Sequence, residues 1–380
     1  MGKKRMNADI PEKKKSKPDP VLLAAWILAI ISAFFVIPDK EYFGYIDWRS
    51  LGILWGLMVV IQGLKENFVF EKIGEVLLKK VSLGWQLSAV LIFMCFFGSM
   101  FITNDVTLIT FVPFAMMILH SSRREDLMIP VVVLQTVAAN MGSMLTPVGN
   151  PQNLYLYGVT GMSIGVFLLT MLPYTLTMAA LLGISILFLP GKNKPMGRKE
   201  NFDTVKHFGN KLIISVYSAL FLLALLSVLR IAPWYIAVII IFLAVLLTDP
   251  KILFRADYIL LLTFIGFFIF TGNMGRITAV KDMLGKLVEG REFYVAVVTS
   301  QFISNVPATL LLSDFTEDYR ELLLGVNVGG LGTLIASMAS LISYKFYSNA
   351  YQKSKGRYFI AFTLVNVLFL ALLILEHLLL

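Results

Sequence analysis

The chain has a single cysteine, Cys95, and it lies inside an apolar run. One cysteine excludes an intrachain disulfide and a thiolate metal cluster, so Cys95 is expected to be a small buried side chain. The sequence also lacks His-Glu-x-x-His, Asp-rich metal motifs and paired carboxylates within its apolar runs. These are the groups that hydrolytic and transfer enzymes use, so an integral-membrane enzyme is the least favoured class and no cofactor is expected.

Charge is scarce as well, since 15% of the residues are charged and 57% are hydrophobic. Several apolar runs reach the roughly 20 residues that a helix needs to cross about 30 Å of hydrocarbon. The net charge of +9 does not indicate nucleic-acid binding, because the Lys and Arg residues lie in short segments between apolar runs, where they orient a membrane protein. The composition predicts an all-α polytopic protein in a lipid bilayer, of the bacterial inner-membrane (plasma-membrane) type.

Nine segments have the character of membrane spans: 21–37, 50–64, 128–159, 166–190, 211–229, 233–248, 256–272, 319–347 and 358–378. Two further apolar stretches, 86–119 and 293–312, are expected to be re-entrant hairpins. The first would rise roughly 51 Å as one straight helix, and basic residues flank both of its ends. The second is assigned as a hairpin because a single crossing would place Lys353, Lys355 and Arg357 outside the cell.

With both hairpins in place, basic residues gather on one side, and the positive-inside rule predicts a cytoplasmic N-terminus and an external C-terminus. The spans of the two halves then run in opposite directions, as an inverted repeat. The predicted parts are a basic cytoplasmic tail, a first transmembrane repeat, a cytoplasmic linker and a second repeat: 1–20, 21–190, 191–210 and 211–380. Each repeat also has an amphipathic stretch, 65–80 or 276–289, expected to be a helix at the membrane surface, with an ordinary loop as the alternative.

Polar motifs recur in the two halves. Ser-Met-Phe-Ile-Thr-Asn at 99–104 returns as Ser-Gln-Phe-Ile-Ser-Asn at 300–305. Further along, Asn140, Gly142 and Thr146 have the same spacing as another set, Asn327, Gly329 and Thr333. Polar and helix-breaking residues at matching places in two halves of a membrane chain are the sequence signal of a transporter's binding site.

These motifs predict four places where a helix unwinds inside the membrane, two in each half. Unwound backbone is tolerated there only when it is buried in protein or lines a wet cavity. Asn150 and Pro151 suit the N-cap and the first residue of a half-helix whose free N–H groups point into the site. Such helix ends attract anions, and the opposite ends attract cations. No Lys or Arg lies in the four breaks, so a coupled cation, Na⁺ or H⁺, would supply the positive charge that an anionic substrate needs.

The two hairpin tips, with the loops 146–153 and 329–340, resemble the paired Ser-Asn-Thr and Gly/Pro-rich motifs of the divalent anion:sodium symporters. These belong to the ion transporter superfamily, which also includes citrate-type permeases, arsenite efflux permeases and some sodium/proton antiporters. The resemblance covers the chain from about residue 21. It implies that the tips hold substrate carboxylates and Na⁺, and that the protein forms a homodimer. The implied site residues are Thr103, Asn104, Ser304 and Asn305 at the tips, completed by Thr146, Gly149, Asn150, Thr333 and Ser337.

Asp105 and Val306 depart from this pattern, because the symporters have Thr at both positions. The family's sodium and carboxylate geometry therefore cannot be transferred intact. A carboxylate at membrane depth costs at least ~2.5 kcal/mol unless it is paired or functional. Three interpretations of Asp105 stay open: a cap of the following helix, a ligand of Na⁺ together with Asn104 and Asn305, or a proton carrier.

The leading functional hypothesis is a secondary active transporter that moves a small anion, a di- or tricarboxylate, with Na⁺ or H⁺. A cation/proton antiporter or a metalloid oxyanion efflux permease is the alternative, for which Asp105 is the best argument. A channel is disfavoured because inverted repeats with closed hairpins suit alternating access. The substrate, the coupling ion and the direction of transport stay open at this point.

Overall fold

The computed structural model describes residues 19–79, 81–195 and 208–380, and within these ranges it is helical, with no β-strand. The predicted all-α fold is therefore confirmed. Most of the predicted basic tail, 1–18, and most of the predicted linker, 196–207, lie outside the described residues.

The helices of the first half are α1 (Pro20–Ala33), α2 (Tyr42–Tyr45), α3 (Trp48–Glu66), α4 (Val69–Leu78), α5 (Gly84–Ile102), α6 (Asn104–Ser121), α7 (Met128–Ser143), α8 (Pro151–Thr160) and α9 (Ile164–Leu187). Those of the second half are α10 (Lys211–Val228), α11 (Trp234–Thr248), α12 (Tyr258–Arg276), α13 (Thr278–Val288), α14 (Glu292–Ile303), α15 (Asn305–Leu312), α16 (Tyr319–Val328), α17 (Met338–Ala350) and α18 (Lys355–Leu379). Short 3₁₀ helices are η1 (Glu125–Leu127), η2 (Pro250–Arg255), η3 (Ser313–Phe315) and η4 (Gln352–Ser354).

In the described part of the chain, 7 helices are long and apolar enough to cross a membrane, or up to 8 if the bent pair α3 and α4 is counted as one span. This confirms a polytopic membrane protein. These 7 helices include both arms of the hairpin predicted at 86–119 as re-entrant. The predicted spans at α1 and α11 have 14 and 15 residues, short of the roughly 20 that cross in one straight helix, and the predicted span 319–347 is divided between α16 and α17. Both predicted broken spans are present: α7 and α8 are separated by 144–150, and α16 and α17 by 329–337.

The two halves repeat one another in detail. Helices α3 and α12 both have 19 residues, and each follows an Asp N-cap, Asp47 or Asp257, that accepts from a backbone N–H three residues later. A short amphipathic helix, α4 or α13, comes next, so the predicted surface stretches are helices. Between α3 and α4 the chain bends by 56°. A helical hairpin follows in each half, made of α5 and α6 in the first and of α14 and α15 in the second.

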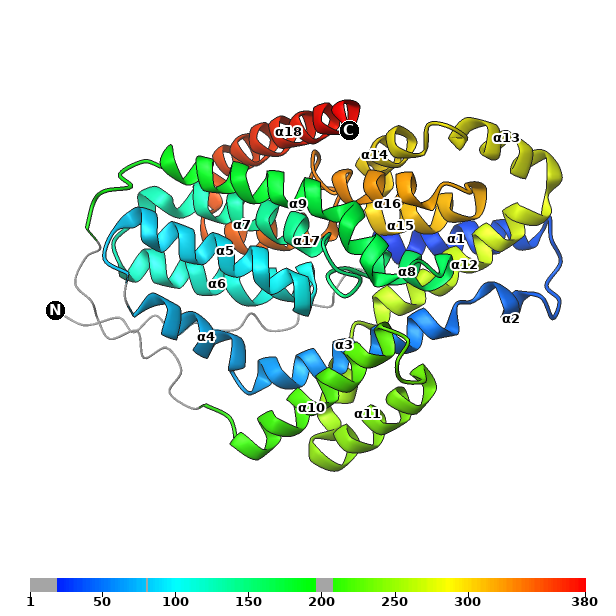
Figure 1. The fold of residues 1–380 in the computed structure, drawn as a ribbon, viewed down its shortest axis with the longest axis horizontal. Helices are drawn as coiled ribbons and strands as arrows, with labels where there is room; N and C mark the ends of the chain where they lie inside the picture. Colours follow the sequence, from blue (N-terminus) through cyan, green and yellow to red (C-terminus); the bar gives the residue numbers. More distant parts are fainter. Residues whose placement is uncertain (1–18, 80, 196–207) are drawn as a thin grey trace.

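The halves also exchange helices. Figure 1 shows α1 lying along α12, and α10 and α11 beside α3, so the first long helices of each half pack on the other half. Glycines allow these close approaches: a Cβ on Gly56 would lie 3.1 Å from Ile241 Cδ1, and one on Gly266 would lie 3.1 Å from Ala25 Cβ. Together α1, α3 and α10 to α12 form a frame beside the hairpins and the broken helices.

The open end of hairpin 1 (α5 and α6) is fastened by Arg124. Its guanidinium is almost fully buried, pairs with the Asp126 carboxylate at 2.9 Å, and donates to the carbonyls of Gly191 and Lys194. A cavity next to Asp126 is lined by Pro190 and by Arg357 at the start of α18. The open end of hairpin 2 (α14 and α15) lies instead at the other end of α18. There the Phe293 ring stacks on the His377 ring, with centroids 3.6 Å apart. The two hairpins therefore enter the bundle from opposite faces.

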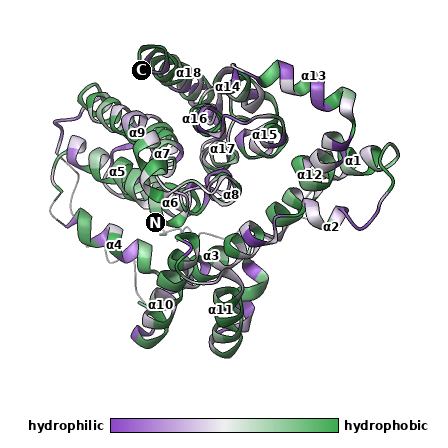
Figure 2. Ribbon diagram, turned by 45° about the vertical axis from the view of Figure 1, so that its right-hand side comes forward, coloured by the Kyte–Doolittle hydropathy of each residue, from purple (hydrophilic) through white to green (hydrophobic). Residues whose placement is uncertain are grey.

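The hairpins differ in length. The arms of hairpin 1 have 19 and 18 residues, and those of hairpin 2 have 12 and 8. The arms of hairpin 2 are too short to cross a membrane. Those of hairpin 1 are long enough, but their tip pairs with the break between α7 and α8 rather than with the far end of α8. Figure 2 shows apolar residues along α9 and α18 and hydrophilic ones at α4, α13 and the connections.

Candidate functional site

The tips of the two hairpins have the same unusual backbone. Thr103 has φ 66° and ψ 151°, and Ser304 has φ 75° and ψ 152°. L-residues rarely adopt this region, and it persists only where the surrounding structure holds it in place. Matching strain at matching tips indicates that both tips serve the same purpose.

Each tip is held by the unwound loop of its own half. The N–H of Asn104 donates to the carbonyl of Gly149 at 3.0 Å, and that of Asn305 donates to Ala336 at 3.0 Å. Thr146 Oγ1 donates to the Met100 carbonyl at 2.5 Å, in the last turn before the tip. Thr333 Oγ1 makes the equivalent bond to Gln301 at 3.0 Å. The predicted residues of tip and loop are therefore brought together in both halves.

Two asparagines then join the halves across the centre. Asn140 of α7 accepts from the hydroxyl of Ser337 at 3.0 Å and donates to that of Ser340 at 3.2 Å, both in the second half. Its oxygen also accepts from Asn104 Nδ2 at 3.2 Å, which links hairpin 1 to this network.

Asn327 of α16 makes the reciprocal contacts into the first half. It accepts from Asn150 Nδ2 at 3.1 Å and donates to Asn153 Oδ1 at 2.7 Å. Asn140 and Asn327 occupy equivalent positions in the two halves. The residues that they bind are equivalent as well: Ser337 and Ser340 correspond to Asn150 and Asn153. All six side chains are nearly inaccessible to solvent. The centre of the molecule is thus a closed network of amides and hydroxyls with a two-fold pattern.

Eight helix ends meet around this network. The N-termini belong to α6, α8, α15 and α17, and the C-termini to α5, α7, α14 and α16. In the first half, Asn150 Oδ1 caps α8 through the Asn153 N–H at 2.9 Å, and Asn104 Oδ1 accepts from the Asp105 N–H at 2.9 Å. The N-cap side chains of α6, α15 and α17 make no such bond to the described residues. At α15 the Asn305 N–H is bonded to Ala336 and Pro307 has no N–H, so α17 keeps more of its first-turn N–H groups free than α15 does.

The loops are also clamped differently. Asn153 Nδ2, at the start of α8, donates to the carbonyls of Met144 and Thr146 at 3.1 and 3.2 Å. In the second half the clamp is Gln301 of hairpin 2, whose Nε2 donates to Gly329 and Leu331 at 3.0 Å each. Met100 stands at the matching position of hairpin 1. Loop 1 is thus tied to the helix that follows it, and loop 2 to its hairpin.

Asp105 is the one carboxylate among the hairpin-tip and loop residues 99–105, 140–153, 300–306 and 327–340. It is partly exposed, and it lies close enough to Asp257, the N-cap of α12, for the two negative charges to repel. A bound cation or proton would relieve this repulsion. The second half has Val306 at the matching position. Asp105 does not cap α6 with its side chain, since no N-cap bond of that kind is present.

The structure thus gathers nine of the ten predicted site residues around the centre, while Thr333 is exposed and ties its loop to Gln301 of hairpin 2. Five further residues belong to this site and had no predicted role in it: Asn140, Asn327, Asn153, Ser340 and Gln301. The repeated Asn140 and Asn327 motif was the signal for two of them. No set of three or more His, Cys, Asp or Glu in the described ranges is placed to hold a metal ion.

Comparison with known proteins gives a consistent result. A citrate transporter family model matches residues 14–316. An uncharacterized transporter of Methanocaldococcus jannaschii is 33% identical over 312 residues, which are 82% of this chain and 84% of the relative. Inner membrane protein YbiR of Escherichia coli is 30% identical over 328 residues, 84% and 86% of the two chains. A silicon efflux transporter of Oryza sativa subsp. japonica is 31% identical over 168 residues, 44% and 33% of the two.

The family match covers both hairpin tips and the first broken helix, and it ends before α16 and α17, which carry Asn327 and Ser340 of the central network. It confirms the resemblance to the citrate-type permeases that the sequence motifs indicated. The long apolar helices show, in addition, that the protein passes the membrane several times. This chain therefore belongs to the citrate transporter family of membrane transporters.

Proposed function

We propose that the protein is a secondary active transporter that moves a small anion, a di- or tricarboxylate, together with Na⁺ or H⁺ by alternating access. The observation that carries this proposal is the central network, in which two broken helices and two hairpins from inverted halves meet without a Lys or Arg. Sites of this construction lie between the repeats of secondary transporters. With no basic side chain present, a cation that binds with the substrate balances its charge.

The substrate anion fits the second half of the site better. The N-terminus of α17 has no side-chain cap, so its first N–H groups and the positive end of its dipole are available to a carboxylate. The positive end of the α15 dipole lies beside it, although the Asn305 N–H is already bonded to Ala336. Ser304, Asn305 and Ser337 lie at these two ends and would add hydroxyl and amide donors. The first half has already used equivalent donors on Asn104 and Asn150.

The coupling cation fits the first half. Asp105 supplies the negative charge at this end, and Asp257 adds a second one nearby. Asn104, with an amide oxygen, stands next to Asp105, and Thr103 precedes it at the tip. Oxygen ligands of this kind suit Na⁺, and the carboxylate alone suits H⁺. Asn305 of the other tip would complete a sodium site only if both tips share one ion.

A metalloid oxyanion efflux permease or a cation/proton antiporter is the second candidate. The observation that favours it is the neutrality of the central amides and hydroxyls, which also suits a weakly acidic, hydroxylated species. One relative is named as a silicon efflux transporter. Thermal-shift measurements with dicarboxylates, citrate, arsenite, Na⁺ and Li⁺ at several pH values separate the candidates, because ligands that bind the folded state stabilise it. Stabilisation by citrate or a dicarboxylate supports the first, and stabilisation by arsenite alone supports the second.

Alanine at Asn104 or at Asn305 is expected to abolish transport while the protein stays folded. Each substitution removes an amide that a bound ion would contact, and losing a buried hydrogen-bonding partner costs about 1–3 kcal/mol, or roughly 5- to 150-fold in affinity. Ligand-induced thermal shifts and uptake into proteoliposomes measure the two effects. The matched control is Asn273→Ala, which removes an equally buried amide at the contact with Ser32, away from the site. Normal uptake by the Asn104 and Asn305 variants would contradict a binding role.

We also propose that the repeats comprise 21–190 and 211–380, that the N-terminus is cytoplasmic and the C-terminus external in a bacterial plasma membrane, and that the protein is a homodimer. The face that holds the open end of hairpin 1 is rich in basic residues, including Arg123, Arg124 and Lys194, which supports a cytoplasmic location. The opposite face carries Asp314, Glu317 and Asp318.

Cysteine at Asp314, in a Cys95→Ser background, is therefore expected to react with an impermeant thiol reagent added outside intact cells. The side chain at 314 is exposed in the structure. Cysteine at Asn193, equally exposed on the opposite face, is the control and should react only after the membrane is opened. The reverse pattern at the two positions would overturn the proposed orientation.

A further inference from the structure

One face of α17 is polar from the central site to the end of the helix. Ser337 and Ser340 bind Asn140, and Ser343 and Tyr347 follow at the spacing that keeps them on the same side. All four are buried. Such a row in a membrane protein is not explained by the α17 contacts with α6, α7 and α18, since apolar side chains would pack those contacts equally well.

Two hydroxyls along this row have no partner. Ser343 Oγ and Tyr358 Oη, the latter on α18, are fully enclosed and form no hydrogen bond with any of the residues that the structure describes. An unpaired polar group in an apolar interior costs about 1–3 kcal/mol, so buried groups of this kind are normally bonded to protein or to water. Tyr358 faces Thr136 of α7 outside hydrogen-bonding geometry, while Thr136 Oγ1 already donates to the Val132 carbonyl.

The unpaired hydroxyls lie between the site and the surface. Thr136 is one turn from Asn140 on the same face of α7. Tyr358 packs against Tyr347, with ring centroids 4.6 Å apart, and against Tyr344, the neighbour of Ser343, at 6.0 Å. Six residues therefore form a polar seam: Asn140 and Thr136 on α7, Ser340, Ser343 and Tyr347 on α17, and Tyr358 on α18.

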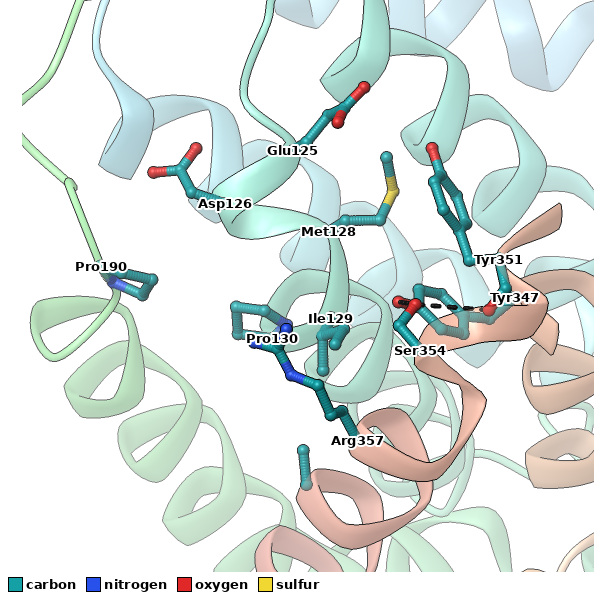
Figure 3. A pocket seen from close by; sticks show the side chains of 11 residues that line it. Glu125, Asp126, Met128, Ile129, Pro130, Pro190, Tyr347, Tyr351, Ser354 and Arg357 are labelled. Carbon is teal, nitrogen blue, oxygen red and sulfur yellow. Dashed lines mark hydrogen bonds between the residues drawn. The ribbon is translucent and has the colours of Figure 1, made fainter.

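The seam ends at a cavity of about 580 Å³ on the face that holds Arg124. Figure 3 shows that Tyr347, Tyr351 and Ser354 line one side of this cavity, with Glu125 and Met128 opposite. The Tyr347 and Ser354 hydroxyls are 2.7 Å apart. Since one water occupies roughly 30 Å³, the cavity has room for several water molecules, and it opens to bulk solvent.

We propose that the polar seam holds a file of internal water molecules that connects this cavity with Asn140. The waters bond to Ser343 Oγ and Tyr358 Oη, which have no other partner. Hydroxyls and waters both donate and accept, so each oxygen in such a file takes up one proton as it releases another, and no atom is gained or lost. Resting on the proposed function, the file delivers coupling protons between the predicted cytoplasmic face and the site.

Radiolytic hydroxyl-radical labelling of the purified full-length protein tests the file directly, because radicals formed from bound water modify the side chains beside it. Tyr358 is expected to be labelled although it is fully buried, whereas Phe167, equally buried and distant from the seam, stays unmodified. In Ser343→Val and in Ser343→Ala, labelling of Tyr358 is expected to fall to that of Phe167, since the apolar replacement leaves a dry seam. The control Ser88→Ala removes a buried hydroxyl that is already bonded to Gly84 at 2.9 Å, and Tyr358 labelling should persist.

An unlabelled Tyr358 in the wild type would overturn the proposal, as would labelling that both Ser343 variants leave unchanged. Uptake into proteoliposomes then tests the role of the file. Ser343→Ala is expected to lose proton-driven uptake while ligand-induced thermal shifts stay as in the wild type. Labelling as expected, combined with wild-type uptake that ignores a proton gradient, would support the water file and exclude proton coupling from the proposed function.

Discussion

Replacing Gly142 by alanine is expected to destabilise the protein strongly, and more than alanine at Gly56 or Gly266 would. A Cβ at this position would lie 2.0 Å from the Phe96 carbonyl oxygen and 2.7 Å from Ser99 Oγ, so α5 and α7 touch backbone to backbone here. The Phe96 oxygen is a backbone atom, so the helices must separate. Overpacking of this kind costs about 1–3 kcal/mol and occasionally more, and we expect the upper end of that range. Thermal unfolding in detergent measures the loss.

Gly183→Ala is the matched control for this experiment. Nothing lies within 4 Å of a Cβ on Gly183, which is in the interior of α9. Alanine there should leave stability unchanged or raise it by about 0.5–1 kcal/mol, because glycine is a poor helix residue. Since Gly142 lies between the hairpin and the central network, its alanine variant should also lose transport. Equal melting temperatures for the two variants would show that α5 and α7 are not in the contact described here.

Asp105→Asn is expected to uncouple transport from its cation gradient while substrate binding persists. The substitution keeps the size of the side chain and removes the charge at the cation end of the site. The loss should be nearly complete for a proton carrier and substantial for a Na⁺ ligand. Uptake into proteoliposomes with imposed Na⁺ or proton gradients, together with substrate-induced thermal shifts, measures both properties.

The control for this experiment is Asp282→Asn, which removes an exposed carboxylate from α13 and should leave coupling unchanged. Because Asn caps helices about as well as Asp, a purely structural role for Asp105 predicts fully coupled transport in Asp105→Asn. In that case the cation site would be assigned to Thr103, Asn104 and their neighbours instead of Asp105. The absence of a side-chain cap on α6 argues against it.

The hairpin tips could be located from the sequence because polar residues in an apolar run are costly and had to be explained. Asn104 and Asn305 were visible in this way, and their repetition doubled the signal. The partners across the centre were not visible. Asn140 and Ser340 are 200 positions apart, and no local rule relates them. Only packing in three dimensions decides which half of the molecule a side chain meets.

Other features of the fold could not be predicted from the sequence for similar reasons. The packing of α1 on α12 depends on the shapes of two apolar surfaces, which composition does not encode. Gln301 reads as one more polar residue in a repeated motif, and its role as a clamp appears only once the carbonyls of Gly329 and Leu331 are in place. The predicted span 21–37 also extends beyond α1, because apolar residues continue past Ala33, the last residue of that helix.

The exchange of α1 and α11 between the halves bears on how such a chain could have arisen. A protein made of one half alone would have no α11 to cover α3, or no α1 to cover α12, so its longest frame helix would lack its closest neighbour. Two copies inserted in opposite directions would each lend the missing helix to the other, as in a domain-swapped dimer. An ancestor of one half would then have been stable only as an antiparallel pair, and gene fusion would have preserved that assembly.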